Sequence, residues 1–393
     1  MPVRVIRSLE DVDPQRWNAL GLGGSPFLRH EFLLAVEQSG AAVPATGWDA
    51  HHLLLEDAEH GLAGAVPLYL KTHSRGEFVF DFAWAEASER AGHAWYPKLV
   101  AAVPFTPATG PRLLVHPAAD ATAVRRRLLA ACRELRRELG ASSLQLLFVT
   151  AAERALPEVQ ELLPRLDCQF HWHNAGYADF DGFLAGLTAE RRKKLRRERR
   201  RVAEAGVSFA TLHGGELDEA RLRDLHRLHA GTFLRHGQQP YVNLDFFRRL
   251  ARTMPEALVV QFALQDHAAV GCSLSLRGDD TLYGRYWGAS RDIHSLHFET
   301  CYYRGIEYCI REQLARFEPG AQGEYKLLRG FAPQPVWSLH EIGHPRLAAA
   351  IARALTLERA RVTRYIADAA EHLPFRHGHA AGPDDDAPDH LAR

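Results

Sequence analysis

Long apolar runs are absent from this chain of 393 residues. No stretch approaches the roughly 20 consecutive apolar residues that a membrane-spanning helix requires, and the first residues contain no apolar signal core. The sequence therefore predicts a cytoplasmic protein with no membrane span. Hydrophobic content of 46% and charged content of 24% are typical of soluble globular proteins, and the length allows two ordinary domains.

Cysteine is also scarce. The five cysteines are scattered, odd in number and without a C-x-x-C pair, which argues against a disulfide framework and a cysteine-based zinc site. His171 and His173 would share one face of a strand, but no third ligand lies near them in sequence, so we predict no metal. Abundant alanine and arginine suggest a GC-rich bacterial genome.

The chain has no net charge, since 48 basic residues balance 48 acidic ones. The charge is unevenly distributed, because residues 190–201 (ERRKKLRRERRR) contain nine basic and two acidic residues, a local excess of +7. Such a block usually contacts anions. A solvated, strongly charged helix face explains it equally well. The candidates for binding a polyanionic donor are Arg196, Arg197, Arg199 and Arg200.

The order of expected elements is similar in the two halves, offset by about two hundred residues, which predicts a duplicated fold. The first half has an expected helix at 26–39, strands at 51–56, 63–71 and 77–84, and a helix starting near residue 95. The second has expected strands at 258–265, 268–277 and 280–287, and a helix from residue 297. The predicted parts are an N-terminal domain (1–175), a C-terminal domain (176–345) ending in a strand, a C-terminal helix (346–373) and a disordered tail (374–393).

The glycine-rich run GAQGEYKLLRGF at 320–331 resembles a signature of the FemAB-like N-acyltransferases, a "peptidoglycan biosynthesis/recognition" family within the GNAT superfamily. Further blocks extend the resemblance to about residue 340: PFLRHEF, PLYLK, VFDFAWA, YPKL, PFTPATGPR, QFHWHN, GRYWG and LHFETCYY. The resemblance implies an α/β (α+β) fold of tandem GNAT-like domains, each a mixed twisted sheet flanked by helices, plus a C-terminal helix.

The resemblance also implies an acyltransferase or aminoacyltransferase that forms an amide on an amine acceptor. The co-substrate would be aminoacyl-tRNA or acyl-CoA, with no tightly bound cofactor. The glycine-rich turn that binds the CoA pyrophosphate in this fold is missing at 86–93 and 289–296, which favours aminoacyl-tRNA. Expected partners are an amine-bearing small molecule or cell-wall precursor, and tRNA. A non-catalytic binding protein that keeps the fold is the alternative.

The glycine-rich run supplies three of the candidate site residues. Glu324 and Lys326 are two residues apart, so on a strand they would point to the same face. We expect them to line an inter-domain cleft together with Arg329, His297 and Glu299. The alternative is a structural ion pair at the end of a strand.

Other candidates come from the aligned blocks. His297 could deprotonate an ammonium group near neutral pH, or it could be a helix N-terminal histidine held by Ser295. Asp81 is a polar residue in an apolar strand, and Arg112 could clamp an anion. The predicted catalytic residues are Glu324, His297, Glu299 and Asp81, and the predicted substrate-binding residues are Lys326, Arg329, Arg112, Arg285 and Tyr286.

Overall fold

The structure is a computed structural model that describes residues 2–321 and 323–376, so most of the predicted tail (374–393) lies outside the described residues. The chain forms two compact units. The first consists of Met1–Asp167, His213–Leu258 and Pro335–Thr363, and the second of Cys168–Leu212, Val259–Gln334 and Arg364–Arg393. These units differ from the contiguous halves predicted from the sequence, because 213–258 and 335–363 belong to the first unit.

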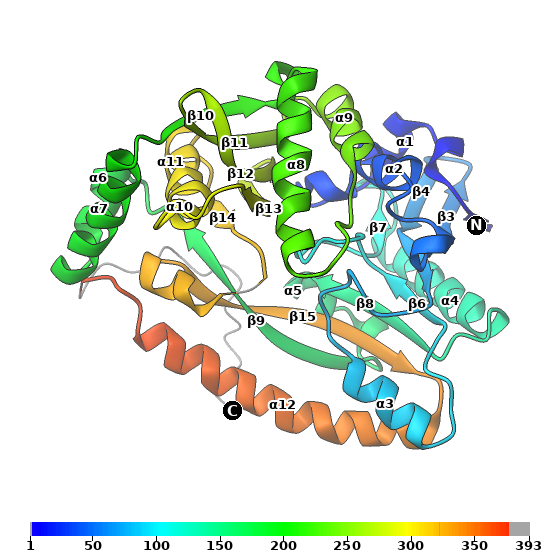
Figure 1. The fold of residues 1–393 in the computed structure, drawn as a ribbon. Helices are drawn as coiled ribbons and strands as arrows, with labels where there is room; N and C mark the ends of the chain where they lie inside the picture. The colour runs from blue at the N-terminus through cyan, green and yellow to red at the C-terminus, as the bar shows by residue number, and fades with distance from the viewer. Residues whose placement is uncertain (1, 322, 377–393) are drawn as a thin grey trace. The chain divides into compact units, whose positions relative to one another are not determined.

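The first unit contains a four-stranded sheet in the order β1-β3-β4-β7 and a run of strands in the order β15-β8-β6-β5-β2. The bounds of the first sheet are β1 Val3–Ile6, β3 His52–Asp57, β4 Gly61–Val66 and β7 Leu114–Val115. Those of the second are β2 Trp48–Ala50, β5 Leu68–Lys71, β6 Lys98–Ala101, β8 Ser143–Val149 and β15 Ala332–Ile342. Its helices are α1 Pro14–Asn18, α2 His30–Gln38, α3 Phe82–Arg90, α4 Ala121–Glu138, α5 Ala151–Arg154, α8 Glu219–Arg235, α9 Leu244–Thr253 and most of α12 Pro345–Glu371 (Figure 1).

The amphipathic helix α4 covers the core of the first unit. Asp120 caps it by accepting from two N–H groups of the first turn. Its apolar face carries Val124 and Leu128, which pack in one cluster with Leu53 and Leu144 of the sheets. Four fully or almost fully buried aliphatic side chains of this size provide several kcal/mol of hydrophobic stabilisation, at about 1.5–3 kcal/mol each.

The second unit contains strands in the order β10-β11-β12-β13-β14-β9. The strand bounds are β9 Leu163–His173, β10 Ser208–His213, β11 Leu258–Gln265, β12 Ala268–Arg277, β13 Thr281–Ala289 and β14 Arg316–Glu318. The helices are α6 Phe180–Gly186, α7 Ala189–Glu204, α10 Leu296–Phe298, a π-helical turn Glu299–Tyr303, α11 Arg304–Arg311 and the 3₁₀ helix η7 Glu324–Arg329. The strands expected at 258–265, 268–277 and 280–287 and the helix from residue 297 are confirmed.

The two units share a pattern of strand pairing. In the first, β5 pairs with β6 antiparallel and β6 pairs with β8 parallel, with α4 between the two parallel strands. In the second, β12 pairs with β13 antiparallel and β13 pairs with β14 parallel, with α10 and α11 between. The expected α/β fold class is confirmed, with mixed sheets flanked by helices and a C-terminal helix.

Two expected elements of the first unit are wrong. The strand expected at 77–84 is absent, because Gly76 and Phe78 adopt positive φ values of 79° and 61° and helix α3 begins at Phe82. The counterpart of β13 is therefore β6. The helix expected near residue 95 is replaced by a non-helical segment that leads into β6. Tyr96 precedes Pro97, and a residue before proline disfavours the helical region. Within the described residues, no helix has the length and apolar character that crossing a membrane requires.

Candidate active site

The parallel strands β13 and β14 pair over a short stretch of the second unit, where β14 ends at Glu318. Residues 281–283 of β13 pair with β14, although β13 continues to Ala289. Just beyond the paired residues, the register with β12 skips Arg285, which forms a β-bulge. Bulges often occur beside active sites, where they re-aim side chains. β13 therefore extends beyond the end of β14, with this bulge beside it.

Lys326 contacts the segment that directly follows β14. Its Nζ donates to the carbonyl oxygen of Gly320 at 2.5 Å. Gly320 in turn lies against β13, since a Cβ added to it would be 3.6 Å from the carbonyl oxygen of Gly284. The side chain is buried, and burial lowers the pKa of Lys326 to about 7, with the neighbouring Cys301 opposing the shift. A large fraction of Lys326 is therefore a neutral amine at physiological pH.

His297 lies beside Lys326 within an aromatic cluster. The centroid of its ring is 5.3 Å from those of Trp287 and Tyr302, and 6.0 Å from that of Tyr325. Burial, followed by the charges of Lys326 and Arg329, lowers the pKa of His297 to about 4. The imidazole is therefore neutral at physiological pH. Ser295 does not hold it, because the Ser295 hydroxyl bonds His294.

Glu324 and Lys326 do not share a face, contrary to the sequence-based expectation. Both lie in η7, and residues two apart in a 3₁₀ helix point in different directions. Glu324 is exposed and accepts a hydrogen bond of 2.8 Å from the Tyr365 hydroxyl, whereas Lys326 is buried. No ion pair joins the two residues. The catalytic role of Glu324 stays a prediction.

Arg329 is engaged by internal partners. Its Nη2 donates to both carboxylate oxygens of Glu198 at 3.0 Å, and its Nε donates to the Tyr303 hydroxyl at 3.0 Å. The third branch, Nη1, donates to the carbonyl oxygen of Tyr325 at 2.9 Å, and the guanidinium lies 3.4 Å from the centroid of Phe298. This geometry makes Arg329 a clamp between η7, α7 and the π-helical turn, and its predicted contact with substrate remains untested.

Glu299 is likewise engaged in ion pairs. Arg199 donates to its two carboxylate oxygens at 3.1 Å each, and Arg304 lies 2.8 Å away. Burial raises the pKa of Glu299, and the two arginines oppose that shift. Arg199 also pairs with Glu307 at 2.7 Å. The geometry thus ties Arg199, a predicted polyanion ligand, to the interior of the second unit.

The other predicted polyanion ligands on α7 are exposed. Arg196 pairs with Asp181 at 2.9 Å, and Arg200 approaches Glu204 at 3.6 Å. Arg197 has no hydrogen bond or ion pair with any described residue. Exposed ion pairs of this kind contribute about 0–1 kcal/mol each, so an anionic ligand could displace them at little cost.

Sequence analysis missed Glu318, the last residue of β14. It is buried, and its Oε1 lies 3.9 Å from Nδ1 of His171 and 3.7 Å from Nε of Arg316. Burial lowers the pKa of Arg285 in the adjacent bulge, with Tyr286 and Glu318 opposing the shift. A carboxylate placed immediately before a Pro-Gly turn at a strand end is a signal that could have identified Glu318.

Asp81 belongs to a buried ion cluster in the first unit. Lys98 Nζ donates to Asp81 Oδ2 at 2.5 Å and to Glu77 Oε2 at 2.7 Å, and Trp95 Nε1 donates to Asp81 at 3.0 Å. Burial by itself would raise the pKa of Asp81, but the Lys98 ammonium and the hydrogen bonds from Ser74 and Gln145 together lower it. The same burial raises the pKa of Glu77 to about 7. The sequence did not predict these partners, because they come from separate elements.

Arg112 is fully enclosed and donates to backbone carbonyl groups. Its Nε bonds Leu147 at 2.5 Å, and its Nη atoms bond Gly110, Pro111 and Ala108 at 2.9–3.1 Å. These bonds hold the turn that precedes β7. Arg112, the expected anion clamp, is therefore bonded within the protein. These internal bonds explain its burial without a contact to substrate.

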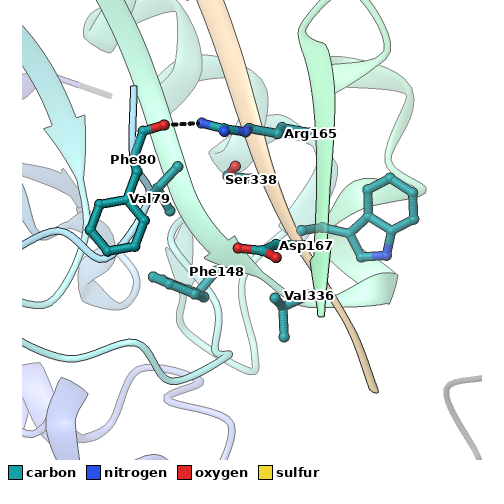
Figure 2. Close-up of a pocket in the computed structure, with 8 residues that line it drawn as sticks. Val79, Phe80, Phe148, Arg165, Asp167, Val336 and Ser338 are labelled. Carbon is teal, nitrogen blue, oxygen red and sulfur yellow. Dashed lines mark hydrogen bonds between the residues drawn. The ribbon is translucent and has the colours of Figure 1, made fainter. Parts of the chain in front are cut away.

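A small pocket of about 30 Å³ lies near Asp81 in the first unit. Figure 2 shows Arg165 donating to the carbonyl oxygen of Phe80, at 2.9 Å, with Asp167 and Ser338 alongside. This volume holds a water molecule and excludes an acyl donor. In the described part of the chain, no group of three or more His, Cys, Asp or Glu residues is arranged to hold a metal ion.

The ion cluster generates a stability prediction. Lys98→Met should lower the free energy of unfolding by about 3–5 kcal/mol, because it leaves two buried carboxyl groups without their ammonium partner. Lys71→Met is the matched control. Lys71 lies 4.0 Å from Glu77, and burial lowers its pKa to about 7, so its loss should cost less. Urea unfolding of both variants measures the difference, and equal losses would contradict this account.

Comparison with known proteins identifies relatives of the chain. The model of the FemAB-like family, described as peptidoglycan biosynthesis/recognition, matches residues 8–377. No curated protein sequence matches.

The structure of FemX is similar at 10% identity and a TM-score of 0.53, covering 90% of this chain and 100% of FemX. L-PGS from Bacillus licheniformis is similar at 9% identity and a TM-score of 0.50, covering 93% and 98%. These likenesses show the fold, which has the mixed α/β class that the sequence resemblance implied. The chain belongs to the FemAB-like family.

Proposed function

We propose that this protein is an N-acyltransferase that forms an amide bond on an amine acceptor. Membership of the FemAB-like family supports the reaction class. The observation that carries the proposal is the buried Lys326, whose pKa is lowered to about 7, beside the end of β14, where β13 continues unpaired on that edge. Acyl transfer to an amine needs a proton acceptor and a group that stabilises the carbonyl oxygen.

Lys326 is the proton acceptor in this proposal. General bases work best when their pKa lies near the operating pH, and burial brings the pKa of Lys326 to about 7. The neutral Nζ takes the proton that the attacking amine loses as the new C–N bond forms. The protonated Nζ then returns a proton to the leaving atom of the donor as the bond between that atom and the acyl carbon breaks. His297, whose pKa is lowered to about 4, is neutral as well but is a much weaker base. Backbone N–H groups of β13 past Tyr283 would then receive the carbonyl oxygen.

We propose aminoacyl-tRNA as the acyl donor. The segment between β13 and α10 has no glycine-rich turn, and α10 has only three residues before the π-helical turn, so it offers a poor pyrophosphate cradle for CoA. Arg196, Arg197 and Arg200 on α7 form an exposed basic face, which suits a phosphate backbone. The acceptor is an amine of a cell-wall precursor, consistent with the description of the family.

A test of Lys326 combines one substitution with a pH profile. Lys326→Met should reduce single-turnover transfer of a labelled amino acid to a lysine-containing precursor by about a hundredfold or more. In the native protein, the rate should rise as the pH increases through about 7, because the neutral amine is the active form. Glu324→Gln is the comparison variant, since the exposed Glu324 was the base expected from the sequence.

Unchanged transfer in Lys326→Met, or a rate that falls as the pH rises through 7, would exclude Lys326 as the base. A large loss in Glu324→Gln alone would restore Glu324 to that role. A protein that binds the precursor but transfers nothing under any condition would be the non-catalytic binding protein, the alternative that the fold also permits.

The basic face of α7 has its own test. Replacing Arg196, Arg197 and Arg200 together by alanine should weaken tRNA binding and reduce the slope of log affinity against log salt by about two to three, one unit for each lost phosphate contact. The control replaces Arg125, Arg126 and Arg127 of α4 in the first unit, three arginines of which Arg126 is exposed and the other two are half-buried. If the two triple variants lost the same tRNA affinity, the assignment of tRNA binding to α7 would be contradicted.

A further inference from the structure

A second, larger pocket lies in the first unit and does not depend on the proposed acyl transfer. Its volume is about 410 Å³, within the range of roughly 300–1,000 Å³ that is typical of small-molecule sites. The walls come from the end of α3, the last turn of α4, the end of β15 and the start of α12. Figure 1 shows α3 alongside the first turns of α12, and Trp84 packs there with Ile351 and Leu355.

The lining is basic. Arg136 and Arg137, from the last turn of α4, both face the pocket, and none of the described residues that line it is acidic. Arg136 retains one acidic neighbour, since its Nε lies 3.3 Å from Glu341, which also pairs with Arg133 at 2.6 Å. Arg137 is less constrained. Its Nε donates to the carbonyl oxygen of Arg133 at 3.2 Å, and its two Nη groups have no partner among the described residues.

Gly343 allows the Arg136 guanidinium to reach the pocket. A Cβ added to Gly343 would lie 2.4 Å from Arg136 Nη1 and 2.9 Å from the carbonyl oxygen of Ser142. Any larger residue would therefore displace the guanidinium or the backbone. The Gly343 N–H donates to the Ser142 carbonyl at 2.8 Å, which fixes this turn against the segment after α4.

Two stacked histidines complete the wall. The ring centroids of His93 and His344 are 4.0 Å apart, with an angle of 35° between the planes. Nδ1 of His344 accepts a hydrogen bond of 3.3 Å from the N–H of Leu347, so the proton of the neutral ring is on Nε2, which is a donor. The pocket also contains the N-terminus of α12, a helix of 27 residues whose dipole favours negative charge there.

We propose that this pocket binds the phosphate group of a phosphorylated small molecule. Arg137 would supply a forked pair of N–H donors and Arg136 a second cation, which is the geometry that matches phosphate oxygens. The volume exceeds that of a phosphate ion, so the remaining space, against Ile342 and Leu347, would take the organic part of the ligand.

Isothermal titration calorimetry of the full chain tests this site, with glucose 6-phosphate and inorganic phosphate as probes. Saturable binding of glucose 6-phosphate is expected, and Arg137→Ala should weaken it about tenfold, the effect of losing one charge-assisted hydrogen bond pair. Arg126→Ala is the control, because it removes the same charge from an exposed position on α4 that does not line the pocket.

Three results would overturn the proposal. Absence of saturable glucose 6-phosphate binding would exclude the site. Equal weakening by Arg137→Ala and Arg126→Ala would show non-specific attraction by the surface charge. Equal affinities for inorganic phosphate and glucose 6-phosphate would overturn the assignment to a phosphorylated molecule and leave a site for free phosphate. Arg137 is exposed and bonds only its own helix, so its replacement should not disturb the fold.

Discussion

The buried ion pair between Glu198 and Arg329 is the constraint on which the second unit depends. Two charges withdrawn from water are stable together only if their hydrogen bonds are completed. Here Nη2 of Arg329 donates to both carboxylate oxygens of Glu198, and Tyr303 bonds both partners. The pair anchors η7 to α7. Lys326 lies on η7, so the position of its amine beside Gly320 follows from an ion pair that the amine itself does not join.

The cost of burying an unpaired charge also distinguishes two kinds of charged residue in the rest of the chain. One kind stabilises the fold, and the other is available to bind a ligand. Lys98 and Arg112 are buried and bonded to internal acceptors, so each stabilises a turn of the first unit. Arg197 and Arg137 are exposed, and each keeps N–H donors without a partner among the residues that the structure describes. Residues of the second kind are where an anion can bind, which is why the tRNA and phosphate proposals rest on them.

Lys326 differs from both kinds. It is buried, and no carboxylate within the described ranges lies within ion-pair distance of its ammonium. A lysine in that environment loses its charge more easily, and burial lowers its pKa to about 7. Perturbed pKa values of this kind cluster at functional sites, although structural networks perturb them as well. The proposed acyl transfer uses this property, and the family provides the reaction class in which a neutral amine base is useful.

The sequence was enough to predict the family, the α/β fold class, and three strands of the second unit, β11, β12 and β13, because these depend on local motifs and hydrophobic patterns. It also singled out the run at 320–331, and the chemical role of that run stays a prediction. Local patterns could not show that Glu324 and Lys326 point apart, since Gly320 and Gly323 adopt positive φ values that turn an expected strand into a 3₁₀ helix. Tertiary structure alone decided which charges are paired, because Glu198 meets Arg329 and Lys98 meets Asp81 only when segments far apart in the chain pack together.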